Sequence, residues 1–143
     1  MIDSLKSIGE YDNYLENIDI GMTKIAAASI EGVVEVSVDQ LILLWSINYS
    51  TYEAHPYLEG TIVLGTLLNK YEVQNTMLLA EVSGGGDPPS WGETRISTAI
   101  AENLEINTTS IETYGNYDEV EVDTVLETYI IRLKEEGFVY EVE

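Results

Sequence analysis

The sequence has 143 residues, a length that fits one domain with a single hydrophobic core. Its 26 acidic residues against 6 basic ones give a formal net charge of −20, and so few cations exclude the Lys and Arg clusters that nucleic acids need. The absence of cysteine excludes disulfides, thiolate metal sites and a cysteine nucleophile.

The acidity also indicates the solvent in which the chain works. Repulsion among carboxylates destabilises a compact fold in dilute buffer, whereas in molar salt the Debye length falls to about 3 Å. We therefore interpret the excess of acid as an adaptation to high salt. The alternatives are an acidic partner of a basic protein and an ordinary acidic protein. A hydrophobic content of 45% argues against disorder.

The first third of the chain predicts a helix followed by strands. Apolar residues recur at helical spacing over residues 2–16, which predicts a short amphipathic helix; this segment is acidic and lacks the apolar core of a secretory signal. Residues 23–30 suit a strand or a turn of small-residue helix. Alternating valines predict a strand within 29–38, and the apolar run of 41–49 predicts a strand buried on both faces, with a buried helix as the alternative.

The middle of the chain predicts helices on either side of a glycine-rich loop. Residues 51–71 carry apolar positions at spacings of three and four, and Gly60 and Gly65 permit another backbone to approach closely. A short strand is expected at 77–82 and a flexible loop at 83–90. Ser90 and Glu93 have the spacing of a capping box, which predicts a helix over 91–104.

The last third predicts strands at 105–114 and 116–122, a helix that begins at Asp123, a left-handed cap at Gly137 and a final strand at 138–142. Together these elements predict an α/β (α+β) fold. We expect one compact domain over residues 1–143, with a mixed sheet of about five or six strands flanked by three or four helices.

No pattern points to catalysis. His55 is the only histidine, and the Gly84–Gly86 run is followed by Asp87 rather than by the lysine of a phosphate loop. Acidic residues at 118–127 lack the spacing of a calcium loop, and we interpret Glu119, Glu121 and Asp123 as the solvated acidic face of a strand. The prediction is no enzyme, no catalytic residue, no cofactor and no metal site.

The tyrosines indicate an interface. Ten of them are too many for one core of this size, and tyrosine favours interfaces because one end is apolar and the other can be wet. The glycine-rich loop and nearby aromatic residues are therefore the candidate subunit interface: Gly84, Gly85, Gly86, Asp87, Pro88, Pro89, Trp91, Tyr114 and Tyr117.

Four short segments resemble one known class of proteins. They are Leu41-Ile42-Leu43-Leu44-Trp45-Ser46, Tyr52-Glu53-Ala54-His55, Leu64-Gly65-Thr66-Leu67-Leu68 and Met77-Leu78-Leu79. This arrangement resembles the tail-terminator or cap (neck ring) proteins of tailed viruses and contractile injection particles. The resemblance implies a small α/β subunit in a ring, usually six-fold, that closes the tail tube beneath the head, with no catalytic residues.

The sequence thus predicts a non-enzymatic structural subunit of a halophilic archaeal virus particle, a tail-terminator or head-tail neck ring component. Its expected partners are copies of itself in a homo-oligomeric ring, such as a hexamer, and other virion proteins, without nucleic-acid specificity. The expected location is the virion, assembled in the host cytoplasm, without secretion by a signal peptide. No apolar run approaches the roughly 20 residues that span a bilayer, so no membrane is expected. The alternatives are a small acidic module that sequesters a basic partner protein, and an enzyme that uses carboxylates alone.

Overall fold

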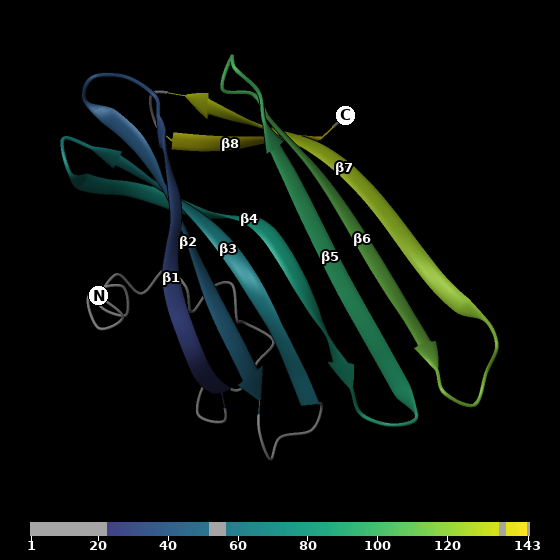
Figure 1. The fold of residues 1–143 in the computed structure, drawn as a ribbon. Coiled ribbons are helices and arrows are strands. Elements are labelled where there is room, and N and C mark those ends of the chain that lie inside the picture. Colours follow the sequence, from purple (N-terminus) through teal and green to yellow (C-terminus); the bar gives the residue numbers. More distant parts are fainter. Residues whose placement is uncertain (1–22, 52–56, 135–136, 143) are drawn as a thin grey trace.

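The computed structural model describes residues 23–51, 57–134 and 137–142, and these residues form one antiparallel sheet of 8 strands. Each strand pairs with the next along the chain, so the sheet is a meander (Figure 1). The strands are β1 (Thr23–Glu35), β2 (Gln40–Thr51), β3 (Tyr57–Asn69), β4 (Glu72–Gly86), β5 (Ser90–Ile100), β6 (Ile106–Asn116), β7 (Val122–Lys134) and β8 (Gly137–Val142).

The predicted α/β fold is wrong, because the described part of the chain contains no helix. The segments predicted as helices over 51–71, over 91–104 and from Asp123 onward are largely strands β3, β5 and β7. The centre of β3 is buried on both faces, so its apolar residues do not alternate and resemble a helical pattern. Burial in β5 does alternate, at the period of a strand. The helix predicted over residues 2–16 lies outside the described residues.

Several predicted strands are confirmed. Residues 41–49 lie in β2, 77–82 in β4, 106–114 in β6 and 138–142 in β8. The strand predicted at 116–122 is wrong, since residues 117–121 form the turn between β6 and β7. Gly137 has the expected positive φ, 119°, but it opens β8 instead of capping a helix.

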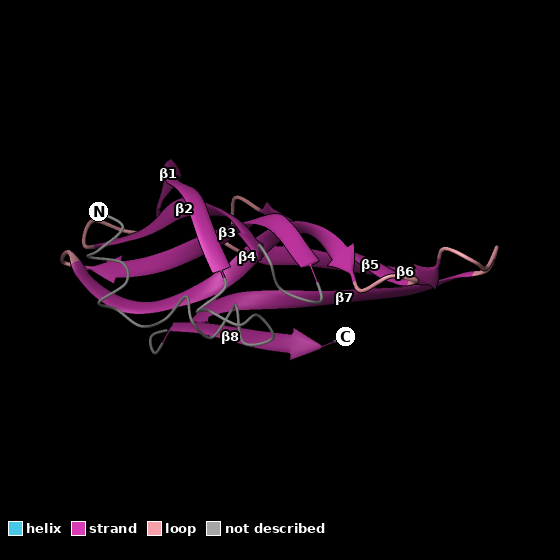
Figure 2. Cartoon of the chain, turned by 90° about the horizontal axis from the view of Figure 1, so that it is seen from below, coloured by secondary structure: helices cyan, strands magenta, loops and turns pink. Residues whose placement is uncertain are grey.

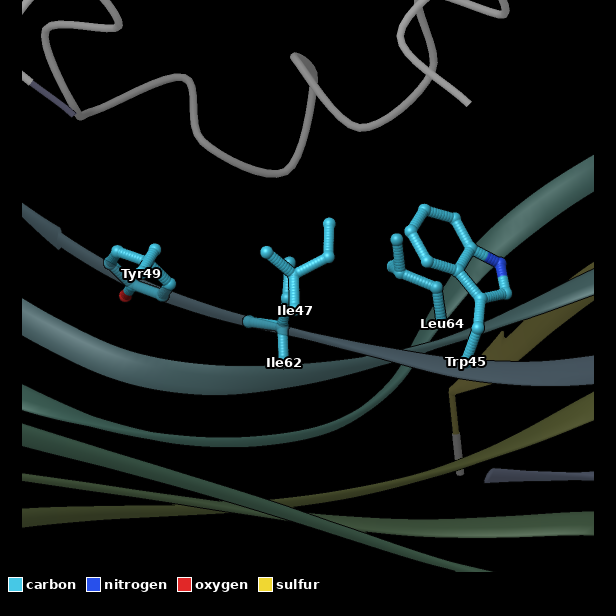
Figure 3. Packing of buried hydrophobic residues seen from close by; sticks show 5 residues of the cluster. All are labelled: Trp45, Ile47, Tyr49, Ile62 and Leu64. Atoms are coloured by element: carbon cyan, nitrogen blue, oxygen red, sulfur yellow. The ribbon is translucent and has the colours of Figure 1, made fainter. Parts of the chain in front are cut away.

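One hydrophobic cluster lies on a face of β2 and β3. Trp45, Ile47 and Tyr49 come from β2, while Ile62 and Leu64 come from β3 (Figure 3). The side chains of one strand lie beside those of the other because the register pairs Trp45 with Leu64 and Ile47 with Ile62. The indole nitrogen of Trp45 donates a hydrogen bond of 2.9 Å to Thr66, so its burial leaves no unsatisfied donor.

A second cluster lies between two layers of the same sheet. β4 pairs with β5 only along Glu81–Gly85, so the first half of β4 separates from β5. Met77 and Leu79 of that half pack against Ile106 of β6 and Ile131 of β7. Figure 2 shows β7 and β8 below β1–β4, and Gly137 at the start of β8 lies against Asn75 of β4. The sheet is therefore a single layer at one end and folds over itself at the other.

A tight turn joins β3 to β4 at the folded end. Lys70 and Tyr71 have φ angles of 50° and 70°. Positive φ at both central residues is the type I′ conformation, whose twist matches that of the flanking strands. Tyr71 is 91% exposed, so this turn presents an aromatic ring to solvent.

Candidate interaction site at the hairpin end

Two turns meet at the single-layer end of the sheet. They connect β4 to β5 and β6 to β7, and the backbone N–H of Tyr117 donates a hydrogen bond of 2.9 Å to the carbonyl of Pro89. The rings of Trp91 and Tyr117 lie 6.5 Å apart, and Trp91 also lies against Gly115. We call residues 84–91 and 114–123 the hairpin end. It gathers every residue of the predicted subunit interface, from Gly84 to Tyr117, in one place.

The glycine run belongs to a strand and not to the predicted loop over 83–90. Gly84, Gly85 and Gly86 lie in β4 and pair with Glu59, Leu58 and Tyr57 of β3. Only residues 87–89 form the turn, which the bond from the Ser90 amide to the Asp87 carbonyl closes. The glycines allow close approach of the neighbouring backbone.

Apolar side chains of the hairpin end face solvent. Tyr117 is 71% exposed and Val120 is 99% exposed, while Tyr114 and Val122 are each about half exposed. The tip is nevertheless held in place by two hydrogen bonds to Asn116. Its side-chain oxygen accepts one from the backbone amide of Asp118, and its backbone carbonyl accepts one from the backbone amide of Glu119. An ordered, exposed group of tyrosine and valine side chains is typical of a protein-binding surface.

Acidic residues surround these apolar side chains. The prediction that Glu119, Glu121 and Asp123 share one face of a strand is wrong. Glu119 lies in the turn, Glu121 lies just before β7, and only Asp123 lies within β7. All three are exposed, and the hairpin end contains no lysine or arginine. In the described part of the chain, no group of three or more acidic, histidine or cysteine side chains is arranged to hold a metal ion.

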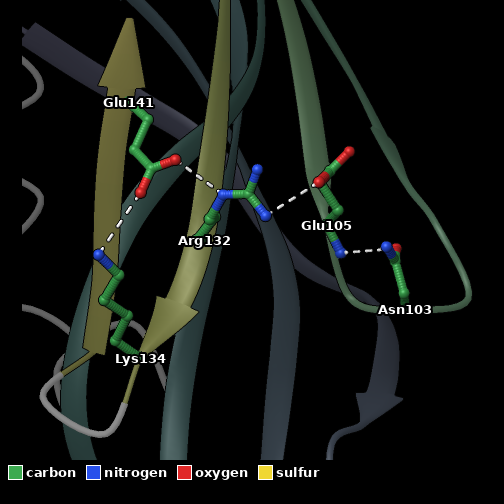
Figure 4. A network of polar contacts seen from close by, with 5 residues as sticks. All are labelled: Asn103, Glu105, Arg132, Lys134 and Glu141. Carbon is green, nitrogen blue, oxygen red and sulfur yellow. Dashed lines mark hydrogen bonds and ion pairs between the residues drawn. The ribbon is translucent and has the colours of Figure 1, made fainter.

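The positive charges lie elsewhere. Near the folded end, Arg132 forms ion pairs of 3.1 Å with Glu105 and 2.7 Å with Glu141, and Lys134 lies 3.4 Å from the same Glu141 (Figure 4). The Arg132 guanidinium lowers the pKa of Glu141. These contacts tie β7 to β8 and to the start of β6. The two cations therefore do not neutralise the hairpin end.

A shallow groove of about 880 Å³ crosses strands β2–β6 and reaches Gly84 and Gly85 of the hairpin end. The strand registers place Asn48, Thr61, Val82, Arg95 and Ile111 in one row across β2–β6. Arg95 is exposed and forms no ion pair with a described residue.

The sequence interpretation missed the first half of β7. Val125 and Leu126 fall within the helix predicted from Asp123 onward, whereas both lie on a strand and are exposed. The signal that could have identified the strand is composition, since residues 122–131 are rich in Val, Thr, Tyr and Ile.

Glu81 lowers the stability of the fold in a pH-dependent way. It pairs with Ile62 across β3 and β4, at the edge of the hydrophobic cluster that contains Trp45. Burial raises the pKa of its carboxyl group and Glu112 adds to that rise, although the Ser83 hydroxyl donates a hydrogen bond to the carboxylate and lowers the pKa in part. A carboxyl group whose pKa is raised in the folded state destabilises that state when it is ionised. Glu81 therefore lowers the free energy of unfolding at neutral pH, and this cost disappears below the ordinary glutamate pKa of 4.5.

We therefore expect Glu81→Gln to raise the free energy of unfolding at pH 7. The gain should shrink as the pH falls towards 4, where both side chains are neutral. Urea unfolding of variant and parent across this range measures the difference. Glu72→Gln, at an exposed position, is the matched control and should give a smaller gain at pH 7, because it relieves only the general repulsion among carboxylates and not the cost of burial. A gain that grows on acidification would contradict the raised pKa.

No family model, no curated protein and no solved structure matches this chain. In the described residues no helix is long and apolar enough to cross a membrane.

Proposed function

We propose that this chain is a non-enzymatic structural subunit that associates with copies of itself through the hairpin end. The observation that carries the proposal is the convergence of exposed Tyr114, Tyr117, Val120 and Val122 on an ordered tip. Aromatic and aliphatic groups of this kind supply most of the energy of a protein interface when they are buried.

The net charge sets the condition under which such contacts form. Each copy carries a formal charge of −20, so copies repel one another in dilute buffer. Salt at about 1 M reduces the Debye length to about 3 Å and also strengthens apolar association when the anion is a strongly hydrated one. Assembly is therefore a high-salt property, in agreement with the proposed halophilic adaptation.

A ring in a virus particle is the specific form of this proposal. It draws on the acidity and on the exposed tyrosines. The tail-terminator resemblance also implied an α/β subunit, and the all-β sheet corrects that part of the expectation. The number of subunits in the ring, its position in the tail and its contacts with other virion proteins belong to this hypothesis. Self-association is its first requirement, and sedimentation measures it.

Sedimentation velocity tests the proposal. The parent chain should be monomeric in about 0.1 M KCl and should form a defined oligomer in about 3 M KCl. Tyr117→Ser combined with Val120→Ser should shift the midpoint of assembly to at least about ten-fold higher protein concentration, because it removes apolar area from the contact.

The matched control replaces the same residue types at the other end of the sheet. Tyr71→Ser combined with Val73→Ser alters the turn between β3 and β4 and the start of β4, and should leave assembly unchanged. A chain that remains monomeric at every salt and protein concentration contradicts the proposal. Equal weakening by both double variants contradicts the assignment to the hairpin end.

A second candidate function is the binding of a basic partner protein. The observation in its favour is the group of acidic side chains at the hairpin end, which no lysine or arginine of that end neutralises. Binding of a basic partner should weaken as the salt concentration rises, because salt screens the attraction between unlike charges, whereas self-association should strengthen.

A further inference from the structure

The outer edge of β7 is paired with another described strand along only part of its length. β8 pairs with β7 only over Tyr129–Lys134, whereas β6 pairs with it from Val122 onward. In residues 122–128, β7 therefore has a neighbour on one side and no described strand on the other (Figure 1). Every second backbone amide and carbonyl along such an edge points outward, as in a template for an added strand.

Apart from the charges of Asp123 and Glu127, this edge lacks the features that protect sheet edges from pairing. Residues 122–128 contain no proline and no lysine, and the pairing of β6 with β7 shows no register shift. β1, the edge at the other side of the sheet, is interrupted by register shifts at Ile25/Ala27 and at Ile30/Gly32. Bulges twist an edge and interrupt its row of donors and acceptors. The first half of β7 is therefore the better template.

The side chains of this half strand specify what it can bind. Val122, Thr124, Leu126 and Thr128 lie on one face, where Leu126 is 64% exposed and stands opposite Ile111 of β6. Asp123, Val125 and Glu127 lie on the other face, where Glu112 of β6 stands opposite Val125. One face is thus uncharged and partly apolar, and the other is acidic.

We propose that residues 122–128 of β7 bind an extended basic segment of a partner protein, which adds a ninth strand to the sheet. The segment places lysine or arginine beside Asp123 and Glu127, and apolar residues beside Leu126. Its sequence therefore alternates basic and apolar residues. This inference rests on the second candidate function, the binding of a basic partner protein, and names its site: the backbone edge of β7, which adjoins the hairpin end and shares Val122 and Asp123 with it.

A second copy of the chain fits this edge less well. If two copies paired in antiparallel fashion about Val125, Asp123 of one would stand opposite Glu127 of the other, twice over. Like charges directly opposite each other destabilise a strand pair, and each whole copy carries a charge of −20. The charges that disfavour a second copy favour a basic strand.

A pair of synthetic peptides tests the proposal with the full-length chain in about 50 mM salt. In the first peptide four lysines alternate with four valines, and in the second the four lysines precede the four valines. Only the first can place every lysine on one face of a strand. It should bind at least about ten-fold more tightly, and it should slow hydrogen exchange of the outward amides in residues 122–128.

Two variants of equal charge locate the site. Asp123→Asn with Glu127→Gln should weaken binding of the alternating peptide by about ten-fold, because both charge pairs across the strands are lost. Asp118→Asn with Glu119→Gln removes the same charge from the adjacent turn and should weaken it by less than about three-fold.

The inference is overturned by equal binding of the two peptides, by unchanged exchange at residues 122–128 in the complex, or by equal weakening in the two variants. Protection of these amides by rising chain concentration without peptide would assign the edge to a second copy and would also overturn it. A failure of self-association is distinguishable from a failure of this inference, because the assembly test uses molar salt and the side chains of Tyr117 and Val120.

Discussion

Gly85→Ala is expected to lower the free energy of unfolding by about 3 kcal/mol or more. A β-carbon at Gly85 would lie 2.0 Å from the carbonyl oxygen of Tyr57 and 3.0 Å from the α-carbon of Leu58, and the residue has a φ of 143°. Both neighbouring atoms are backbone atoms of β3, so no side-chain rotation relieves the overlap. The change should therefore separate β3 from β4 at the hairpin end.

Gly92→Ala is the matched control. Gly92 pairs with Gly85 across β4 and β5, yet its β-carbon would have only ordinary contacts, 3.8 Å to the Thr113 carbonyl and 3.9 Å to Tyr114. Its effect should stay within about 0.5 kcal/mol. Urea unfolding at constant high salt measures both variants. A Gly85→Ala protein as stable as the parent would show that these glycines form a connector and not a strand.

Ile131→Ala is expected to cost about 3 kcal/mol, within the range for truncation of a fully buried isoleucine. Ile131 is 0% exposed and pairs with the equally buried Ile106 in the cluster between the two layers. The neighbouring Ile130 lies on the opposite face and is only half-buried. Ile130→Ala should therefore cost about 1 kcal/mol or less.

A double-mutant cycle makes this second prediction specific to the folded-over sheet. Met77 of β4 and Ile131 of β7 are members of one buried cluster, although β5 and β6 lie between their strands in the order of the sheet. The cost of Met77→Ala with Ile131→Ala should depart from the sum of the single costs by at least about 0.5 kcal/mol. Strict additivity would contradict contact between the layers.

Much of the local structure was predictable from the residues themselves. The apolar run Leu41–Trp45 belongs to a buried strand, as expected. Of the alternating valines that predicted a strand within 29–38, Val34 lies in β1, whereas Val36 and Val38 lie in the turn after it, so the predicted strand is only partly confirmed. Gly60 and Gly65 were predicted to admit another element. That element is the chain's own β4, since a β-carbon at Gly65 would lie 2.6 Å from Leu79 and one at Gly60 would lie 2.6 Å from Ser83.

The helices were mispredicted for a reason that lies in non-local packing. A strand covered on both faces has no polar face, so β3 keeps no alternation that separates it from a buried helix. The Ser90–Glu93 match to a capping box is accidental, because Ser90 begins β5 and Glu93 pairs with Thr113 of β6. Strand pairing over long stretches of chain overrides such local signals.

Composition alone determined that the chain is strongly acidic, free of cysteine and supplied with more tyrosine than one core needs. It also marked the glycine-rich segment and Tyr117 as parts of one candidate interface. Only the tertiary structure decided that these residues meet, that the sheet folds over itself, and that half of β7 has no described strand on its outer side, because each depends on which strands pair and where the pairing stops. Charge is a property of the residues, whereas an open edge is a property of their arrangement.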